Sequence, residues 1–263
     1  MELGLKDRGI MVAAASEGIG YGIAEALARD GARLSIASRS REKIERAAKT
    51  LRESYGIDCS AYVMDAADAQ SIRSWCEATL EDLGEVQGLV VNAGGPPPGN
   101  FDDFDDDAWA RACELTLMSA VRMVRCVLPE LRRQKSGSIL TVTSSSIKEP
   151  IDQLLLSNVF RAGVVALVKS LANELAGDGI RVNNLVPGRI NTQRVRSLDT
   201  MIAGKKGVVL EDEQAEQYAA IPLGRYGTIE DMGAAGAFLL SDAASYITGA
   251  TLVVDGGKMR SVT

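Results

Sequence analysis

The sequence contains no histidine. This absence excludes Ser-His-Asp and Cys-His catalysis, H-E-x-x-H zinc sites and imidazole general bases. Cysteine is scarce as well. The four cysteines, Cys59, Cys76, Cys113 and Cys126, show no C-x-x-C spacing. A tetrahedral Cys/His metal site and a disulfide scaffold are therefore both disfavoured, and we expect no metal.

Long apolar runs and basic stretches are also missing. No run of about 18 apolar residues exists that would span a bilayer, and residues 1–10 carry charges without the apolar core of a signal peptide. The net charge is −6 and no basic stripe occurs, which disfavours nucleic acid as a partner. With 46% apolar and 24% charged residues, the composition is that of a globular protein. We expect a cytoplasmic protein with a small-molecule substrate and no membrane partner.

What the 263 residues do show is a regular alternation of short apolar runs with longer amphipathic segments. This alternation predicts βαβ units, and hence a doubly wound parallel α/β sheet in a single domain with ligands at the carboxyl ends of the strands. The predicted strands are 10–14, 34–37, 61–64, 88–91, 138–143, 181–186 and 251–254. The predicted helices are 20–29, 41–55, 69–83, 106–133, 155–176 and 229–240.

Three segments carry additional signals. The helix predicted at 155–176 is apolar around nearly its whole circumference, which indicates burial on more than one side. The stretch 94–99, G-G-P-P-P-G, predicts a rigid loop because its prolines fix φ and lack N–H donors. Five aspartates within 102–107 suggest either a cation site or, as we favour, the start of a helix, where carboxylates are stabilised by the helix dipole.

The segment from Met11 to Gly20 has the pattern of a strand, a tight turn and a helix. Gly18 and Gly20 would let the backbone approach a pyrophosphate closely, and the helix that follows would direct N–H groups toward it. Taken alone, this pattern also fits a simple turn between a strand and a helix.

Further motifs follow in order: Asp65-Ala66, Asn92-Ala93-Gly94, Pro187-Gly188 with Thr192, and Y-I-T-G with V-D-G-G near the C-terminus. Together with the glycine turn, in which Ala14 replaces a first glycine, they resemble the short-chain dehydrogenase/reductase family over nearly the whole chain. In detail the chain resembles the β-ketoacyl-carrier-protein reductases, in particular a divergent branch that carries a G-G-P-P-P-G loop. The resemblance implies a seven-stranded Rossmann-type sheet of order 3-2-1-4-5-6-7 and a homotetramer paired through 155–176. It also implies a dinucleotide site at Ala14, Ser16, Gly18, Ile19, Gly20, Ser38, Arg39, Asp65, Ala66, Asn92, Gly94, Pro187, Gly188 and Thr192.

The choice of cofactor depends on the end of the second strand. A carboxylate there would bond a ribose 2′-hydroxyl, whereas Ser38 and Arg39 suit a 2′-phosphate. Glu17 opposes this interpretation, because the resemblance implies a basic residue at its position. The methyl group of Ala14 could also push the pyrophosphate outward. We expect NADP in preference to NAD.

At the catalytic positions the resemblance fails. The family's reductases use Asn, Ser, Tyr and Lys, and these positions align with Thr116, Ser144, Ser157 and Arg161. A serine hydroxyl is a much weaker acid than a phenol, so Ser157 should be a poor proton donor. Arg161 remains a cation but has a different reach and geometry from lysine. Three functions stay open: a reductase with a remodelled site, a non-redox enzyme, and a silent binding protein.

Other residues could supply a proton or bind substrate. Lys148 follows Ser144 on the loop expected to line the cleft and could act as an acid if it were desolvated, or be a solvated lysine. Arg189 and Arg194 suggest an anionic substrate, a phosphate clamp or a plain surface position. The segment 193–220 is the expected substrate lid. Tyr218 within it and Tyr226 beyond it are more readily explained by packing than by proton donation.

Overall fold

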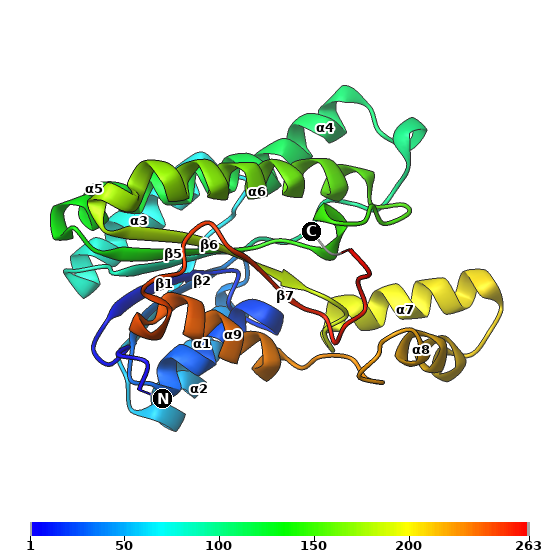
Figure 1. Ribbon diagram of the computed structural model, residues 1–263, viewed down its shortest axis with the longest axis horizontal. Coiled ribbons are helices and arrows are strands. Elements are labelled where there is room, and N and C mark those ends of the chain that lie inside the picture. The colour runs from blue at the N-terminus through cyan, green and yellow to red at the C-terminus, as the bar shows by residue number, and fades with distance from the viewer. Residues whose placement is uncertain (1, 262–263) are drawn as a thin grey trace.

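Seven parallel strands form one sheet in the order β3-β2-β1-β4-β5-β6-β7, as the sequence predicts. The computed structural model describes residues 2–261. Because every neighbouring pair is parallel, the strands all end at the same edge of the sheet, which faces the helices α7 and α8 in Figure 1. The strands are β1 (Gly9–Ala13), β2 (Arg33–Ser38), β3 (Cys59–Val63), β4 (Gly88–Val91), β5 (Gly137–Val142), β6 (Ile180–Pro187) and β7 (Thr251–Val254).

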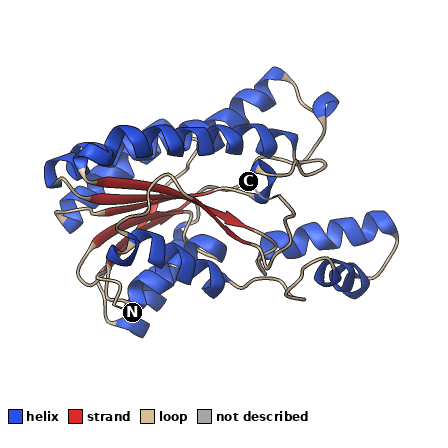
Figure 2. Cartoon of the chain, viewed as in Figure 1, coloured by secondary structure: helices blue, strands red, loops and turns tan. Residues whose placement is uncertain are grey.

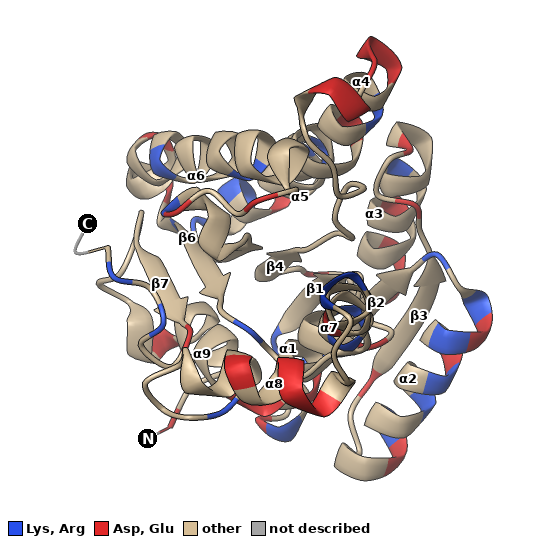
Figure 3. Cartoon of the chain, turned by 90° about the vertical axis from the view of Figure 1, so that its right-hand side faces the viewer, with Lys and Arg blue, Asp and Glu red and all other residues tan. Residues whose placement is uncertain are grey.

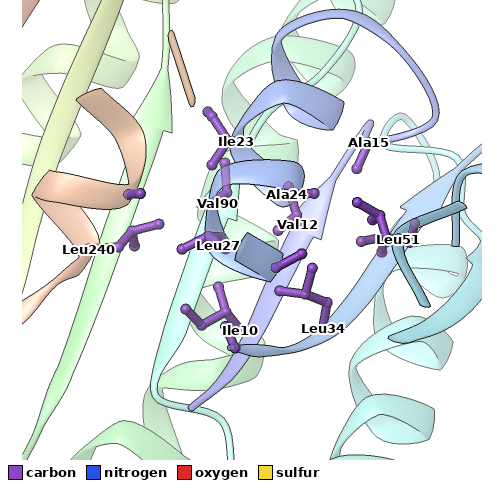
Figure 4. Packing of buried hydrophobic residues seen from close by; sticks show 14 of the residues in the cluster. Ile10, Val12, Ala15, Ile23, Ala24, Leu27, Leu34, Leu51, Val90 and Leu240 are labelled. Atoms are coloured by element: carbon purple, nitrogen blue, oxygen red, sulfur yellow. The ribbon is translucent and has the colours of Figure 1, made fainter. Parts of the chain in front are cut away.

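Helices cover both faces of the sheet, which makes a three-layer arrangement (Figures 1 and 2). One face carries α1 (Gly18–Arg29), α2 (Arg41–Tyr55) and α9 (Ile229–Leu240); the other carries α3 (Ala69–Leu83), α5 (Ser119–Gln134) and α6 (Leu155–Leu175). Each face buries its own cluster of aliphatic side chains. Figure 4 shows the cluster under α1, where Ile23 and Leu27 pack against Val12 and Val90 of the sheet.

Contact between α1 and α9 depends on glycine. A Cβ at Gly22 would lie 2.3 Å from the carbonyl oxygen of Ile229, and a Cβ at Gly233 would lie 2.3 Å from the carbonyl oxygen of Gly22. Since no side chain can occupy either position, the two helix backbones pack directly against one another. This contact holds the start of α1, and with it the glycine turn, at a fixed height over the sheet.

The helix predicted at 106–133 is wrong as a single element. It consists of α4 (Asp106–Cys113), a π-helical turn at Glu114–Met118, and α5. The π turn inserts extra backbone into the helix and turns Thr116 into the interior. Figure 1 shows α4 standing away from the axis of α5. Alternating apolar residues continue through the π turn, so the sequence pattern gives no sign of it.

Helix α6 covers the sheet with one side only. Its residues Leu156, Val164, Val168 and Ala172 are buried against the core, whereas Val159 on the outer side is 45% exposed. By length and composition the segment 155–178 is apolar enough to cross a membrane. Within this fold, however, its inner face packs on β6. The outer apolar face is uncovered in the single chain.

The lid expected at 193–220 consists of α7 (Gln193–Lys206) and α8 (Leu210–Ala219). Both helices project beyond the carboxyl ends of the strands, and Figure 3 shows them in front of that edge. Ion pairs join the two helices of the lid. Lys206 Nζ lies 2.7 Å from a carboxylate oxygen of Glu213, which is buried, and 2.8 Å from one of Glu216.

Candidate functional site

The main cavity opens at the carboxyl ends of the strands, where the strand order reverses between β1 and β4. Its volume is about 800 Å³, large enough for a dinucleotide half together with a small substrate. All of the predicted cofactor residues except Gly20 line it. The fold therefore brings these separate motifs together around one cavity at one edge of the sheet.

Gly20 lies beneath the pocket floor, where only a glycine fits. A Cβ there would be 2.3 Å from the carbonyl oxygen of Ala14 and 2.9 Å from Nδ2 of Asn92. Asn92 donates a hydrogen bond from Nδ2 to that same carbonyl at 3.5 Å. The glycine turn and the segment after β4 are thus joined directly below the expected pyrophosphate position.

Ala14 keeps the backbone conformation that glycine would adopt. Its φ is +50°, in the left-handed region, and Gly18 in the same turn has φ +65°. A left-handed conformation costs an L-residue roughly 1–2 kcal/mol. The turn therefore retains the shape of a phosphate-binding turn at some cost, with the Ala14 methyl group beside the pocket.

At the end of β2 the pocket is basic. Arg39 is exposed and makes no hydrogen bond or ion pair with another of residues 2–261. Lys43 of α2 also lines the pocket and forms an ion pair with Glu17, Nζ to Oε2 3.0 Å. Ser40 caps α2 by accepting a hydrogen bond from the backbone N–H of Lys43. Ser40 and Lys43 were not predicted as site residues, although a helix start directly after Arg39 was a usable signal.

Arg161 occupies the substrate end of the pocket. Its Nε donates to Ser157 Oγ at 3.1 Å, and its Nη1 donates to the carbonyl oxygens of Val142 and Thr143 at 3.1 and 3.2 Å. Burial, followed by the charge of Arg194, lowers the pKa of Arg161 to about 10. Hydrogen bonds thus hold the Nε and Nη1 atoms of the guanidinium. Among residues 2–261, the buried polar atoms without a partner do not include its third nitrogen, Nη2.

Ser144 and Ser157 have different positions. Ser144 lines the pocket and accepts a hydrogen bond from the backbone N–H of Ser146 at 3.2 Å, which leaves its own proton free to donate. Ser157 is 5% exposed and does not line the pocket. Its hydroxyl accepts a hydrogen bond from Arg161, which lies between Ser157 and the pocket. Ser157, which aligns with the family's tyrosine, thus contacts Arg161 and does not line the main cavity.

Thr116 lies beside Arg161 but outside the main pocket. Both residues line a second cavity of about 10 Å³, together with Asn92 and Thr143. Thr116 Oγ1 is buried without a hydrogen-bond partner among residues 2–261. A cavity of this size accommodates one water molecule, and Thr116 is placed to bond it.

The other candidate donors are not in place. Lys148 is exposed and does not line the pocket, so the burial that an acidic lysine needs is missing. Tyr226 donates to Asp199 at 2.9 Å; burial, and then this hydrogen bond, raise its pKa above the usual range. Tyr218 packs edge-on against Tyr226, with ring centroids 4.7 Å apart. Arg189 lines the pocket but forms an ion pair with buried Asp199.

The aspartate run begins helices. Asp105 caps α4 by accepting from the N–H of Ala108 at 2.8 Å, and Asp103 accepts from the N–H of Asn100 at 2.7 Å. Across residues 2–261, no group of three or more Cys, Asp or Glu side chains is arranged to hold a metal ion.

Comparison with known proteins agrees with this geometry. Residues 13–258 match the family model described as enoyl-(acyl carrier protein) reductase. The pig protein dehydrogenase/reductase SDR family member 4 is 33% identical over 256 residues, which covers 96% of this chain and 88% of the relative. The 3-oxoacyl-(acyl-carrier-protein) reductase of Salmonella typhimurium is 34% identical over 249 residues, 94% of this chain and 95% of the relative.

A solved structure is similar along its whole length. L-sorbose reductase from Gluconobacter frateurii, in complex with NADPH and L-sorbose, superposes with a TM-score of 0.95 at 27% identity and covers all of both chains. The chain therefore belongs to the short-chain dehydrogenase/reductase family, a family of oxidoreductases.

Proposed function

We propose that the protein is an NADPH-dependent reductase of a carbonyl substrate, similar to 3-oxoacyl reductases but with a non-standard catalytic set. One observation carries the proposal: a single pocket holds a phosphate-binding turn and Arg39 at one end, and Ser144 with Arg161 at the other. An extended dinucleotide that follows this edge would bring its nicotinamide to the end with Ser144 and Arg161.

The residues present fit NADP(H). Gly18, with φ +65°, and the start of α1 can accept the pyrophosphate, since N–H groups and the helix dipole point toward it. Arg39, the basic Lys43 and the capped start of α2 meet where a 2′-phosphate would lie. The similar L-sorbose reductase was solved with NADPH.

When bound, NADPH supplies the hydride. The protein's part is to place and polarise the carbonyl group. The hydroxyl of Ser144 donates to the carbonyl oxygen, and the cation Arg161 lines the same pocket. Burial and the charge of Arg194 lower the pKa of Arg161, which makes its N–H groups stronger hydrogen-bond donors to a developing oxyanion.

The site lacks the phenol that a general acid would provide, because no tyrosine is among the residues lining the pocket. General acid catalysis contributes about 10²–10⁴-fold, so we expect slow turnover of ordinary ketones. Thr116 and one water beside Arg161 would form the path by which the oxyanion is reprotonated. We also propose a cytoplasmic location and a homotetramer; free thiols and the uncovered face of α6 support them.

The test is a titration of the protein with NADPH and NADH, followed by nucleotide fluorescence, and then a panel of ketones assayed for NADPH oxidation. Tight NADPH binding with slow oxidation by some panel member is the expected result. Binding without any oxidation would favour a non-redox enzyme. Failure of both nucleotides to bind would favour a silent protein.

A further inference from the structure

The loop Gly94–Gly99 and the lid meet at one contact. The guanidinium of Arg194, from the first turn of α7, lies against Gly95, so that a Cβ on Gly95 would be 2.1 Å from Nη2 and 2.4 Å from Nη1. The side chain of Arg194 occupies the space that any other residue at 95 would fill. Because Gly95, the second glycine of the G-G-P-P-P-G loop, has no side chain, it leaves space for the Arg194 guanidinium.

Arg194 is a cation with no counterion in the part of the chain that the structure describes. It is exposed into the pocket, and it forms no ion pair or hydrogen bond with another of residues 2–261. The surrounding protein desolvates it enough to lower its pKa, and its charge in turn lowers the pKa of Arg161. Two like charges thus face one part of the pocket, an arrangement that costs free energy unless an anion neutralises it.

No carboxylate among residues 2–261 forms an ion pair with either arginine. Arg161 is held only by Ser157 and by backbone carbonyl oxygens. The carboxylates on this side of the pocket, Glu149 and Asp255, accept hydrogen bonds from the backbone N–H groups of Arg260 and Met259. In contrast, Arg189 is neutralised by Asp199.

The two arginines contact segments other than the glycine turn and the end of β2. Arg161 hydrogen-bonds to the end of β5, and Arg194 lies against the loop that follows β4. The turn after β1 and the end of β2, where the pyrophosphate and the 2′-phosphate would bind, have their own donors. The loop Gly94–Gly99 is anchored on the substrate side, since the N–H of Gly99 donates to the carbonyl oxygen of Gln153 at 2.6 Å.

Apolar side chains form part of the wall at this end of the pocket. Leu115, Ile151, Leu154, Leu198 and Met259 line it. A ligand that suits these walls has an apolar body and one anionic group close to the carbonyl that Ser144 polarises.

We propose that Arg161 and Arg194 form a carboxylate subsite, and that the substrate is a free oxo acid with an apolar body and not a neutral ester or thioester. This proposal rests on the proposed reductase function, whose site it deepens. The carboxylate would bridge the two guanidinium groups through charge-assisted hydrogen bonds.

The test measures binding without turnover. Protein saturated with the oxidised nucleotide NADP⁺, which cannot reduce a ketone, is titrated calorimetrically with 2-oxo-4-phenylbutanoate and 3-oxo-5-phenylpentanoate and with the methyl ester of each. We expect at least one acid to bind about 10–100-fold more tightly than its ester. In Arg194→Gln this preference should fall below about threefold, while the affinities for the esters and for NADP⁺ stay unchanged.

Arg196→Gln is the matched control. Arg196 is on the same helix, is exposed, donates to Asn191 and does not line the pocket, so this variant should keep the full preference for the acid. Gly95→Ala gives an independent check, because its methyl group must displace the Arg194 guanidinium. It should reduce the preference as Arg194→Gln does, and combining the two should cause no further loss.

Equal binding of both acids and their esters by the wild-type protein would overturn the subsite. A loss of NADP⁺ affinity of about tenfold or more in Arg194→Gln would also overturn it, and would make Arg194 a clamp for the pyrophosphate. Failure of the reductase function would give a different result. An acid would still bind more tightly than its ester, but none of the four compounds would oxidise NADPH. Turnover of acids and esters at equal rates, with equal binding, would keep the reductase and remove the subsite.

Discussion

Lys43 Nζ lies 3.0 Å from Oε2 of Glu17, an ion pair that joins α2 to the turn in front of α1. The pair answers the main objection to NADP, which was an acidic residue at a position expected to be basic. The negative charge of Glu17 is neutralised, and Arg39 is left without a partner among the described residues. Arg39 is thus the residue in position to discriminate between the two nucleotides.

Arg39→Ala should weaken NADPH binding by about one to two orders of magnitude and leave NADH binding nearly unchanged. The reason is that a charge-assisted contact to the 2′-phosphate is worth about 1.5–3 kcal/mol. Fluorescence titration with each nucleotide measures both effects. Arg41→Ala is a suitable control, because Arg41 pairs with Glu45 and does not line the pocket. Equal losses for NADPH and NADH would refute the assignment.

Ala14→Gly should stabilise the protein by about 0.5–1 kcal/mol. Glycine relieves the left-handed conformation at φ +50°, and the gain exceeds the extra entropy that glycine gives the unfolded chain. Thermal denaturation should show a rise in Tm of about 1–4 °C. Ala15→Gly should have the opposite effect, since Ala15 is buried and its φ is not positive. A loss of stability in Ala14→Gly would show that the alanine is not strained.

Ser157→Tyr combined with Arg161→Lys should raise NADPH-dependent reduction of a simple ketone by up to about 10²-fold. The pair must change together. The buried site of Ser157 has no room for a phenol while Arg161 covers it, and the phenol needs a nearby ammonium to lower its pKa. Each single variant serves as a control and should stay slow. A double variant that binds NADPH normally yet remains inert would mean that the pocket is not arranged for carbonyl reduction.

Acid should loosen the lid through Glu213. The hydrogen bond from Lys206 holds the pKa of Glu213 below its ordinary value of 4.5. A lowered carboxylate pKa contributes stability above the ordinary value, and this contribution is lost as the pH falls from 4.5 through the lowered pKa. Limited proteolysis within 193–220 should therefore accelerate in this range. Glu213→Gln should be cut rapidly at neutral pH as well. Glu216→Gln, at an exposed partner of the same lysine, should differ little from wild type.

Light scattering should show a mass of about four times the 27.9 kDa chain. The outer face of α6 is apolar and uncovered, and Val159→Lys should shift the mass downward because it places a charge on that face. Val208→Lys, at an exposed apolar residue of the lid region, is the control. A wild-type protein that remains a 27.9 kDa monomer at micromolar concentration would contradict the tetramer.

Local patterns predicted the layered fold, and the family resemblance assigned most of the cofactor residues. Each strand and the helix that follows it have a hydrophobic periodicity that can be recognised in the sequence. A parallel sheet places the carboxyl ends of all its strands at the same edge. The resemblance to the short-chain dehydrogenase/reductase family then assigned motifs far apart, such as the glycine turn and Pro187-Gly188, to one pocket without coordinates. Five of the seven strands differ from the prediction by one or two residues at an end, and β4 and β7 have the predicted bounds.

Side-chain direction and pairing were decided by the tertiary structure. The sequence placed Ser157, Arg161, Arg189 and Arg194 near the substrate, but it could not show that Ser157 lies behind Arg161. Nor could it show that Arg189 forms an ion pair with Asp199 while Arg194 has no counterion among the described residues. Such differences depend on which groups from distant segments come within hydrogen-bond distance, and on how much water their burial removes. Both are properties of the packed chain, and no local pattern of residues records them.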